Sequence, residues 1–188
     1  MAPTVIVLAS GRGERFLASG GSGHKLQARL GDTTVLAHTL AAVRASGLPW
    51  HLEDAGHPGM GDSIAAAVRA TADAAGWLIL PADLPLVLPQ TLRRIAAAPA
   101  AMRVLRPVYQ GQPGHPVRFD RCCGPALMAL SGEQGAAALA RQYGPDTLAV
   151  DDAGCVTDVD TVAALRQAEA LWRARAAAPA PGHGSRVT

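Results

Sequence analysis

Two uninterrupted apolar runs constrain the fold of this chain more than any other feature. The first is VIVLA, residues 5–9, and the second opens the segment WLILPADLPLVLP, residues 77–89. A strand that is apolar at successive positions is typical of a parallel sheet that is covered on both faces. Ligands bind such sheets at the carboxyl ends of the strands. We therefore expect a site in the loops that follow Ala9 and Leu80.

Helical and extended patterns alternate along the rest of the chain. Gly47 and Pro49 mark a helix end, and Asp62 or Ser63 is the expected N-cap of a helix that ends at Gly76. The expected helices cover residues 35–47, 62–76, 90–98, 124–144 (as two short pieces) and 161–178, and the expected strands cover 50–54, 102–110, 114–119, 146–151 and 155–160. Strands that alternate with helices predict an open, largely parallel α/β sheet.

Composition narrows the class of protein. The chain has 188 residues, of which 49% are hydrophobic, and a net charge of +2. We expect one domain over residues 1–173 and a mobile tail at 174–188. The chain has no block of like charges and no apolar run long enough to span a membrane, and we expect no signal peptide, so nucleic acid and membranes are not expected partners. Cys122, Cys123 and Cys155 lack the spacing of disulfides or a zinc site, and we expect a soluble, cytoplasmic protein.

The loop after the first apolar run, SGRGERF, has a phosphate-binding pattern. Gly11 and Gly13 allow backbone N–H groups to converge on an anion, and Arg12, Arg15 and the later Lys25 add positive charge. The loop is not a Walker A motif, since no G-K-[ST] follows, and it lacks the third glycine of G-x-G-x-x-G. A solvated surface loop is the alternative interpretation.

Three aspartates are candidates for binding a hard divalent cation. Asp83 follows the second apolar run, between two prolines, and Asp158 and Asp160 bracket one residue of an expected short strand. Alternation along a strand would point this pair to the same face. Mg²⁺ binds through one or two carboxylates together with phosphate oxygens. The alternatives are structural, with Asp83 as a turn cap and Asp160 as the N-cap of the last helix.

His115 stands between a glycine and a proline in the segment GHPVRF. It enters an expected strand, where it is either a turn residue without a role or a substrate contact. The other five histidines are scattered along the chain and indicate no metal site.

Five segments occur in an order that is informative as a set: LASGRGERF with the lysine of HKL, GMGDSI, LPADLPLV, GHPVRF and DDAGCVTDVDT. Together they resemble the MobA-like nucleotidyltransferase family, and most closely its molybdenum cofactor cytidylyltransferases. The resemblance extends over residues 4–170. It implies a Rossmann-like three-layer α/β fold with a mostly parallel sheet. It also implies an enzyme that transfers a nucleotide from an NTP to an acceptor phosphate, with Mg²⁺ as cofactor and pyrophosphate as the second product.

The resemblance also implies roles for individual residues. It assigns Leu8, Ala9 and Ser10 to the base and ribose, Gly11–Arg15 and Lys25 to the triphosphate, Ser63 to the base, and His115 to the pterin side of the acceptor. Asp83 would hold Mg²⁺ together with Asp160 or, alternatively, Asp158. Arg15, Lys25 and Asp83 would be catalytic. The implied acceptor is a pterin phosphate, and a molybdenum hydroxylase or its maturation factor is an expected partner.

The resemblance also bears on the choice of base. Ala9-Ser10 stands where the guanylyl-transferring branch has two glycines, and the narrower space beside the base favours CTP over GTP. The chain departs from the family pattern at two places. Nine residues lie between Arg15 and Lys25, several more than the family usually has, so a longer and more mobile loop is expected there. Between residues 47 and 59 the chain is short, so one βα unit of the fold is expected to be missing. A guanylyltransferase, a sugar-phosphate nucleotidyltransferase and a non-catalytic nucleotide- or cofactor-binding maturation factor remain alternatives.

Overall fold

A seven-stranded sheet forms the middle layer of the computed structural model, which describes residues 2–99 and 101–177. The strands are β1 (Thr4–Leu8), β4 (Trp50–Glu53), β5 (Gly76–Pro81), β6 (Val104–Tyr109), β7 (Gln112–Pro113), β8 (Val117–Asp120) and β9 (Asp146–Ala149). They follow the order β4-β1-β5-β8-β6-β7, and β9 also pairs with β6. Five strands share one direction, while β8 and β7 run against it. The expected mostly parallel α/β sheet is confirmed.

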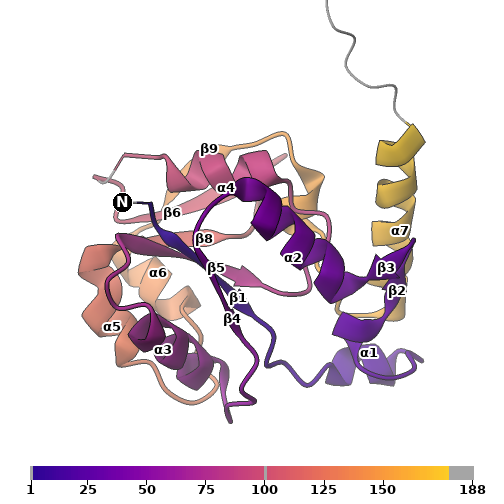
Figure 1. Ribbon diagram of the computed structural model, residues 1–188, viewed down its shortest axis with the longest axis horizontal. Coiled ribbons are helices and arrows are strands. Elements are labelled where there is room, and N and C mark those ends of the chain that lie inside the picture. The colour runs from indigo at the N-terminus through magenta and orange to yellow at the C-terminus, as the bar shows by residue number, and fades with distance from the viewer. Residues whose placement is uncertain (1, 100, 178–188) are drawn as a thin grey trace, which may run out of the picture.

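Helices cover both faces of this sheet (Figure 1). They are α1 (Glu14–Ala18), α2 (Val35–Ser46), α3 (Met60–Ala70), α4 (Pro89–Ala96), α5 (Gly124–Met128), α6 (Ala137–Tyr143) and α7 (Val162–Ala177). Three 3₁₀ turns, η1 (Lys25–Gln27), η2 (Arg121–Cys123) and η3 (Ala153–Val156), and a two-stranded hairpin, β2 (Arg29–Leu30) with β3 (Thr33–Thr34), complete the described chain. The three layers match the expected fold class.

Alternation along β1 divides the core into two clusters. Val5 and Val7 pack in one cluster with residues of α2, α4 and α7, and Ile6 and Leu8 pack in the other with residues of α3, α5 and α6. Residues 5–7 are fully buried. Because each face of β1 meets helices, every position of the strand is apolar, which is the pattern that the sequence presents.

Several element boundaries differ from expectation. The strand expected at 155–160 is wrong: the turn η3 covers its first two residues, and residues 157–160 belong to no strand. The helix expected at 62–76 begins at Met60, after Gly59, and ends at Ala70. Gly76 instead opens β5. The helix α7 continues to Ala177, so residues 174–177 belong to it and not to a tail. The remainder of the expected tail, 178–188, lies outside the described residues.

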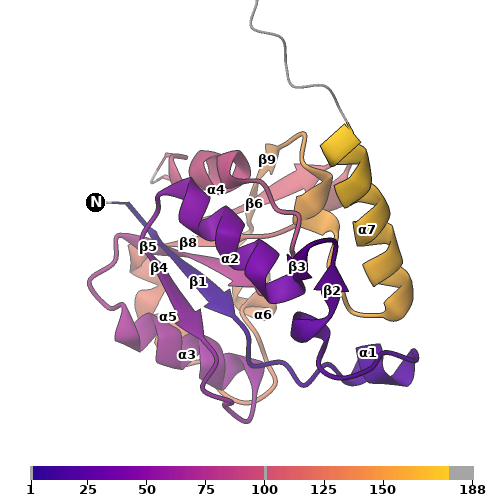
Figure 2. The ribbon, with the colours of Figure 1, turned by 45° about the vertical axis from the view of Figure 1, so that its right-hand side comes forward.

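The N-terminal loop and the C-terminal helix lie side by side. In the two ribbon views, α1 and the β2–β3 hairpin lie next to α7 (Figures 1 and 2). Phe16 of α1 is buried in the core, and a side chain at Gly31 in the hairpin would collide with Trp172 of α7. The first and last quarters of the chain therefore meet at one corner of the sheet. Among the described residues, none of the helices is long and apolar enough to cross a membrane.

Candidate active site

A buried lysine bridges two carboxylates at the carboxyl end of the sheet. Lys25 Nζ donates to Asp83 Oδ2 at 2.6 Å and to Asp160 Oδ1 at 2.5 Å. The side chains of Lys25 and Asp83 are only 13% and 12% exposed. Arg15 Nη2 contacts the other oxygen of Asp160 at 2.6 Å. The structure thus joins four of the predicted site residues in one ion-pair network.

Local hydrogen bonds hold Lys25 in place. His24 Nδ1 accepts from the backbone N–H of Leu26 and caps η1, at whose start Lys25 lies. Because Nδ1 accepts, the proton of the ring is on Nε2, which donates to the carbonyl oxygen of Gly11 at 2.6 Å. The expected long loop between Arg15 and Lys25 is partly helical, since α1 covers Glu14–Ala18. Lys25 is therefore tied to the glycine loop by its neighbouring histidine.

Asp160 is available to the site because another residue caps the last helix. Thr161 Oγ1 accepts from the N–H of Ala164, and Ser19 Oγ accepts from the N–H of Val162. The alternative interpretation of Asp160 as the N-cap is wrong. The neighbouring Val159 N–H donates to the carbonyl oxygen of Asp83 at 2.9 Å. This bond fixes the segment of Asp160 beside the loop that follows β5.

The ionisation of the network follows from burial and charge. Burial alone would lower the pKa of Lys25, but Asp83 and Asp160 raise it above its usual value. Burial raises the pKa of Asp83, which Lys25 opposes. Burial also acts to raise the pKa of Asp160, but Lys25 and then Arg15 lower it. Asp158 is exposed as a residue, but its carboxyl group is partly buried. This partial burial, followed by the neighbouring Asp160, raises the pKa of Asp158.

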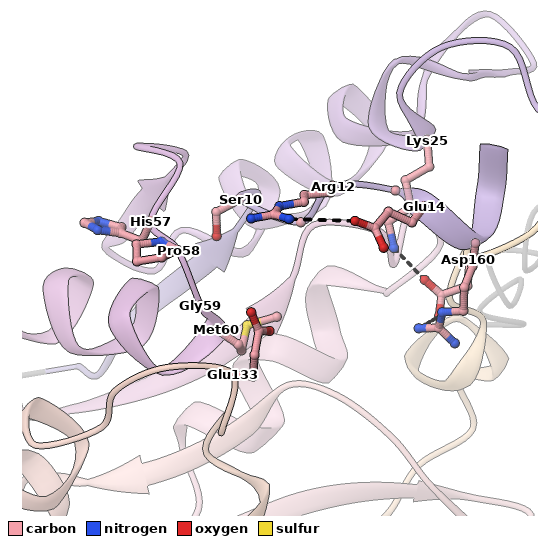
Figure 3. Close-up of a pocket in the computed structure, with 13 residues that line it drawn as sticks. Ser10, Arg12, Glu14, Lys25, His57, Pro58, Gly59, Met60, Glu133 and Asp160 are labelled. Atoms are coloured by element: carbon pink, nitrogen blue, oxygen red, sulfur yellow. Dashed lines mark hydrogen bonds and ion pairs between the residues drawn. The ribbon is translucent and has the colours of Figure 1, made fainter. Parts of the chain in front are cut away.

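The glycine loop forms one wall of a cavity of about 500 Å³. The cavity is lined by the glycine loop, by the segment at the start of α3 and by Lys25, Glu133 and Asp160. The lining residues are Ser10, Gly11, Arg12, Gly13, Glu14, Arg15, Lys25, His57, Pro58, Gly59, Met60, Glu133 and Asp160. Figure 3 shows Lys25 and Asp160 at one side and Ser10, His57 and Pro58 at the other. Gly13 has φ of 68°, a left-handed conformation that glycine adopts without strain.

Other predicted residues lie around this cavity and not in its wall. Ser63 is fully buried and donates to the carbonyl oxygen of Gly59, so Ser10 donates its own proton to Ser63 Oγ at 2.7 Å. Ser63 therefore reaches the cavity only through Ser10. Ala9 packs on the core. Leu8 and His115 line a second cavity of about 390 Å³.

Sequence reasoning missed several cavity residues. His57, Pro58 and Met60 lie just before and at the start of α3, and Glu133 lies in the connection between α5 and α6. The loop with Glu133 is clamped on α3, because Gly61 N–H donates to Gly132 O and Gly132 N–H donates to Asp62. Glu133 has no recognisable signal in the sequence. Gly59 and Gly61 are the signal that could have found this contact, because a side chain at either position would collide with the backbone of residues 131–134.

The carboxylates fit a divalent cation that is shared with a phosphate ligand. Asp83 Oδ1 is buried and has no hydrogen-bond partner among the described residues. Lys25 Nζ lies within 2.6 Å of an oxygen of Asp83 and of an oxygen of Asp160. The two carboxylates are therefore close enough to each other to share one cation. In the described ranges, no group of three or more histidine, cysteine or acidic side chains could hold a metal alone. Mg²⁺ and Mn²⁺ suit such a set, since ligand phosphate and water oxygens can complete the coordination.

Comparison with known proteins shows the family of the chain. Residues 41–147 match the model of the MobA-like NTP transferase domain. The match includes Asp83 and His115, whereas the glycine loop, Lys25 and Asp160 lie outside it. No curated protein matches the chain.

Solved structures extend the similarity to nearly the whole chain. Rv0371c from Mycobacterium tuberculosis is 26% identical with a TM-score of 0.76, over 90% of this chain and 98% of that one. A complex of Rv0371c with manganese has a TM-score of 0.71, also at 26% identity, over 90% and 99%. A nucleotidyl transferase from Methanothermobacter is 20% identical with a TM-score of 0.74, over 92% and 99%. Molybdopterin-guanine dinucleotide biosynthesis protein A from Archaeoglobus fulgidus is 16% identical with a TM-score of 0.63, over 91% and 99%.

Proposed function

The chain belongs to the MobA-like NTP transferase domain family, and on that premise we propose that it transfers CMP from CTP to a molybdopterin-type acceptor. The observation that supports this most is the Lys25 ammonium between the carboxylates of Asp83 and Asp160, beside the glycine loop. A positive group and two potential metal ligands at one point suit the transfer of a phosphoryl group. The family assignment and the cavity are the same whichever base the nucleotide has.

The proposed reaction needs positioning and charge neutralisation. An oxygen of the acceptor phosphate attacks the α-phosphorus of CTP, and the bond from that phosphorus to the bridging oxygen of pyrophosphate breaks. Arg12 and Arg15 are the exposed cations of the loop and would bind the β- and γ-phosphates, while Lys25 neutralises charge at the α-phosphate. Pyrophosphate leaves with the electron pair of the broken bond.

The two carboxylates are proposed to hold the divalent cation. Asp83 and Asp160 are the ligands in this assignment, with Asp158 as the alternative, and a bound Mg²⁺ would neutralise phosphate charge during transfer. The reported manganese complex of Rv0371c supports a cation in a related protein. In the chain itself, the support is the unpartnered Asp83 Oδ1.

The choice of base is proposed from the side chains beside the glycine loop. Ser10 lines the cavity, and its position is fixed by Ser63. A side chain here narrows the space for a base and favours the pyrimidine of CTP. Transfer of GMP is the second candidate, since one structural relative is named for a guanine dinucleotide.

Release of pyrophosphate from each nucleotide tests the proposal. The purified protein is mixed with Mg²⁺, molybdopterin on a carrier protein and either CTP or GTP, and dinucleotide and pyrophosphate are quantified. We expect turnover with CTP and little with GTP. Turnover with GTP alone would contradict the argument from Ser10. Nucleotide binding without turnover of either would favour the non-catalytic maturation factor.

Substitution of Asp83 tests the metal assignment. Asp83→Asn keeps the size of the side chain and the backbone carbonyl that accepts from Val159, so we expect the fold to persist. Loss of a charged metal ligand should lower kcat by about three orders of magnitude. Pyrophosphate assays and thermal melting check both parts, and Asp151→Asn, at an exposed position, is the control. Unchanged turnover in Asp83→Asn would refute the assignment.

A further inference from the structure

The cation that lies between Asp83 and Asp160 is a side chain of the protein itself. Lys25 is the only lysine among the 188 residues of the chain. Its Nζ lies 2.6 Å from Asp83 Oδ2 and 2.5 Å from Asp160 Oδ1, as the dashed line to Asp160 marks in Figure 3. Arg15 Nη2 lies 2.6 Å from Asp160 Oδ2. Cationic side chains therefore bond three of these carboxylate oxygens, and the fourth, Asp83 Oδ1, has no partner among the described residues.

A divalent cation and this ammonium compete for one place. A metal ion shared by the two carboxylates must lie between them, where Lys25 Nζ lies. The side chains of Lys25, Asp83 and Asp160 are only 13%, 12% and 17% exposed, so water screens little of the repulsion between two cations at this point. Binding of a metal by this pair of carboxylates therefore requires the ammonium to leave.

Only the side chain of Lys25 has to move for this exchange. Its backbone is held, because His24 caps η1 and donates to the carbonyl oxygen of Gly11. Its stem lies against the glycine loop, since a Cβ at Gly13 would come within 3.5 Å of Lys25 Cγ. Lys25 also lines the same cavity as the loop, and a lysine stem is flexible. The ammonium can therefore turn from the carboxylates to a phosphate at the glycine loop while the backbone stays in place.

We propose that Lys25 is an internal cation of the metal site, and that a nucleotide phosphate draws its ammonium off Asp83 and Asp160 when the metal binds. This role rests on the proposed metal assignment, but not on the transfer reaction or the identity of the base. The phosphate that accepts Lys25 stabilises the arrangement in which the carboxylates are free to bind a metal. Metal and nucleotide then bind cooperatively, and each raises the affinity of the other by the same factor.

Titration of the protein with Mn²⁺, without nucleotide, tests the competition. Free Mn²⁺ is measured by electron paramagnetic resonance for the wild type, Lys25→Met and Lys25→Arg. We expect Lys25→Met to bind Mn²⁺ about tenfold more tightly than the wild type, because the competing charge is gone. Lys25→Arg keeps the charge and should bind Mn²⁺ as weakly as the wild type does. Asp83→Asn in the Lys25→Met background should abolish the gain.

Arg12→Met is the matched control. It removes a cation that lines the same cavity, but the Arg12 side chain is 77% exposed and pairs with Glu14, not with the two aspartates. We expect it to change the affinity for Mn²⁺ by less than about twofold, since water screens exposed charges. Circular dichroism verifies that each variant is folded.

The single lysine allows a second measurement on the wild-type chain, which decides the matter even where Lys25→Met does not fold. Protein labelled with ¹⁵N-lysine has one side-chain ammonium signal in nuclear magnetic resonance spectra, that of Lys25 Nζ. We expect saturating Mg²⁺ alone to shift this signal, because the ammonium leaves its two carboxylates. Bound CTP or GTP, in EDTA and without metal, should also shift it, because a phosphate draws the ammonium away.

The outcomes separate this role from the proposed reaction. The role of Lys25 is overturned if Lys25→Met binds Mn²⁺ no more tightly than the wild type, or if Lys25→Arg binds it as tightly as Lys25→Met. It is also overturned if the Nζ signal stays in place with saturating Mg²⁺ or with bound nucleotide. Absence of pyrophosphate release with every NTP would refute the reaction alone, because the competition is measured by binding without turnover.

Discussion

At the scale of single residues, the contact that matters most is the one that Lys25 makes with two carboxylates. Lys25 and Asp83 are 58 positions apart in the sequence, and Lys25 and Asp160 are 135 apart. Each carboxylate alone would be costly to bury, and the ammonium between them offsets that cost. We propose that the same three groups bind the phosphate and the metal. The stability and the proposed chemistry of the site therefore depend on the same charges.

Removal of this ammonium should make stability depend on pH. In the wild type, Lys25 lowers the pKa of Asp160 in the folded state. The Asp160 carboxylate therefore stabilises the fold at pH values above its unfolded pKa, and this stabilisation is lost as the pH falls through its folded pKa. In Lys25→Met the two carboxylates lose their cation and their pKa values should rise, so stability should increase as pH falls from 7 to 5. We expect a loss of about 3 kcal/mol at pH 7 and a smaller loss at pH 5.

Urea unfolding at the two pH values measures this difference. Arg12→Met, which removes a cation from a side chain that is 77% exposed, is the control and should change stability little at either pH. An equal loss at pH 7 and pH 5 in Lys25→Met would show that packing, and not charge, accounts for the effect.

At the scale of elements, a buried arginine joins the sheet to the helix α4. Arg118 of β8 is 4% exposed and pairs across the sheet with Leu78 and Leu105. Its Nη1 donates to the carbonyl oxygens of Ile95 and Ala98, and its Nη2 donates to those of Pro99 and Met102. One guanidinium thus satisfies carbonyl groups at the end of α4 and in the turn beyond it. This is a structural role for a charge in the core.

Loss of this cap should destabilise the protein without changing the site. Arg118→Met fills a similar volume but leaves several buried carbonyl groups without a donor, so we expect a loss of about 3 kcal/mol in the free energy of unfolding. Denaturant titration measures it, with Arg121→Met at an exposed position as the control. Affinity for CTP should remain that of the wild type, and a parallel loss of CTP affinity would contradict a purely structural role.

At the scale of the whole molecule, Asp152 connects three separate parts of the chain. It is 1% exposed, and its Oδ2 accepts from Leu88 N–H at 2.9 Å and from Thr91 Oγ1 at 2.7 Å. Its Oδ1 accepts from Gly154 N–H and from Arg175 Nη2. Arg175 also donates to the carbonyl oxygen of Leu86. The carboxylate therefore joins the start of α4, the turn η3 and the end of α7, whose first turn follows Asp160.

Neutralising this carboxylate should release the end of α7. Asp152→Asn replaces one acceptor oxygen by an N–H₂ group that faces donors, and we expect a loss of about 3 kcal/mol in global stability. Hydrogen exchange should be faster at the end of α7 and at the start of α4 than in β1 and β5, because both helix ends bond to this carboxylate whereas the two strands do not. Asp146→Asn, at an exposed position, is the control. Unchanged exchange in α7 would exclude Asp152 as its anchor.

The sequence by itself determined the layers of the fold and one edge of the site. Successive apolar residues in 5–9 and 77–80 require cover on both faces, and glycines and arginines directly after the first run predict an anion-binding loop at the strand end. These features are local, since neighbouring residues and the period of the pattern carry them. The same logic identified Asp83, which follows β5 in sequence.

Only the tertiary structure decided which distant groups meet. The distance of Asp160 from Lys25 and the partners of Arg118 and Asp152 each depend on how separate elements pack. The strand expected at 155–160 is absent for the same reason: among the described residues, no strand of the sheet pairs with this alternating segment. Hydrogen bonds and ion pairs between residues far apart in sequence leave no periodic pattern, because their geometry exists only after the chain has folded.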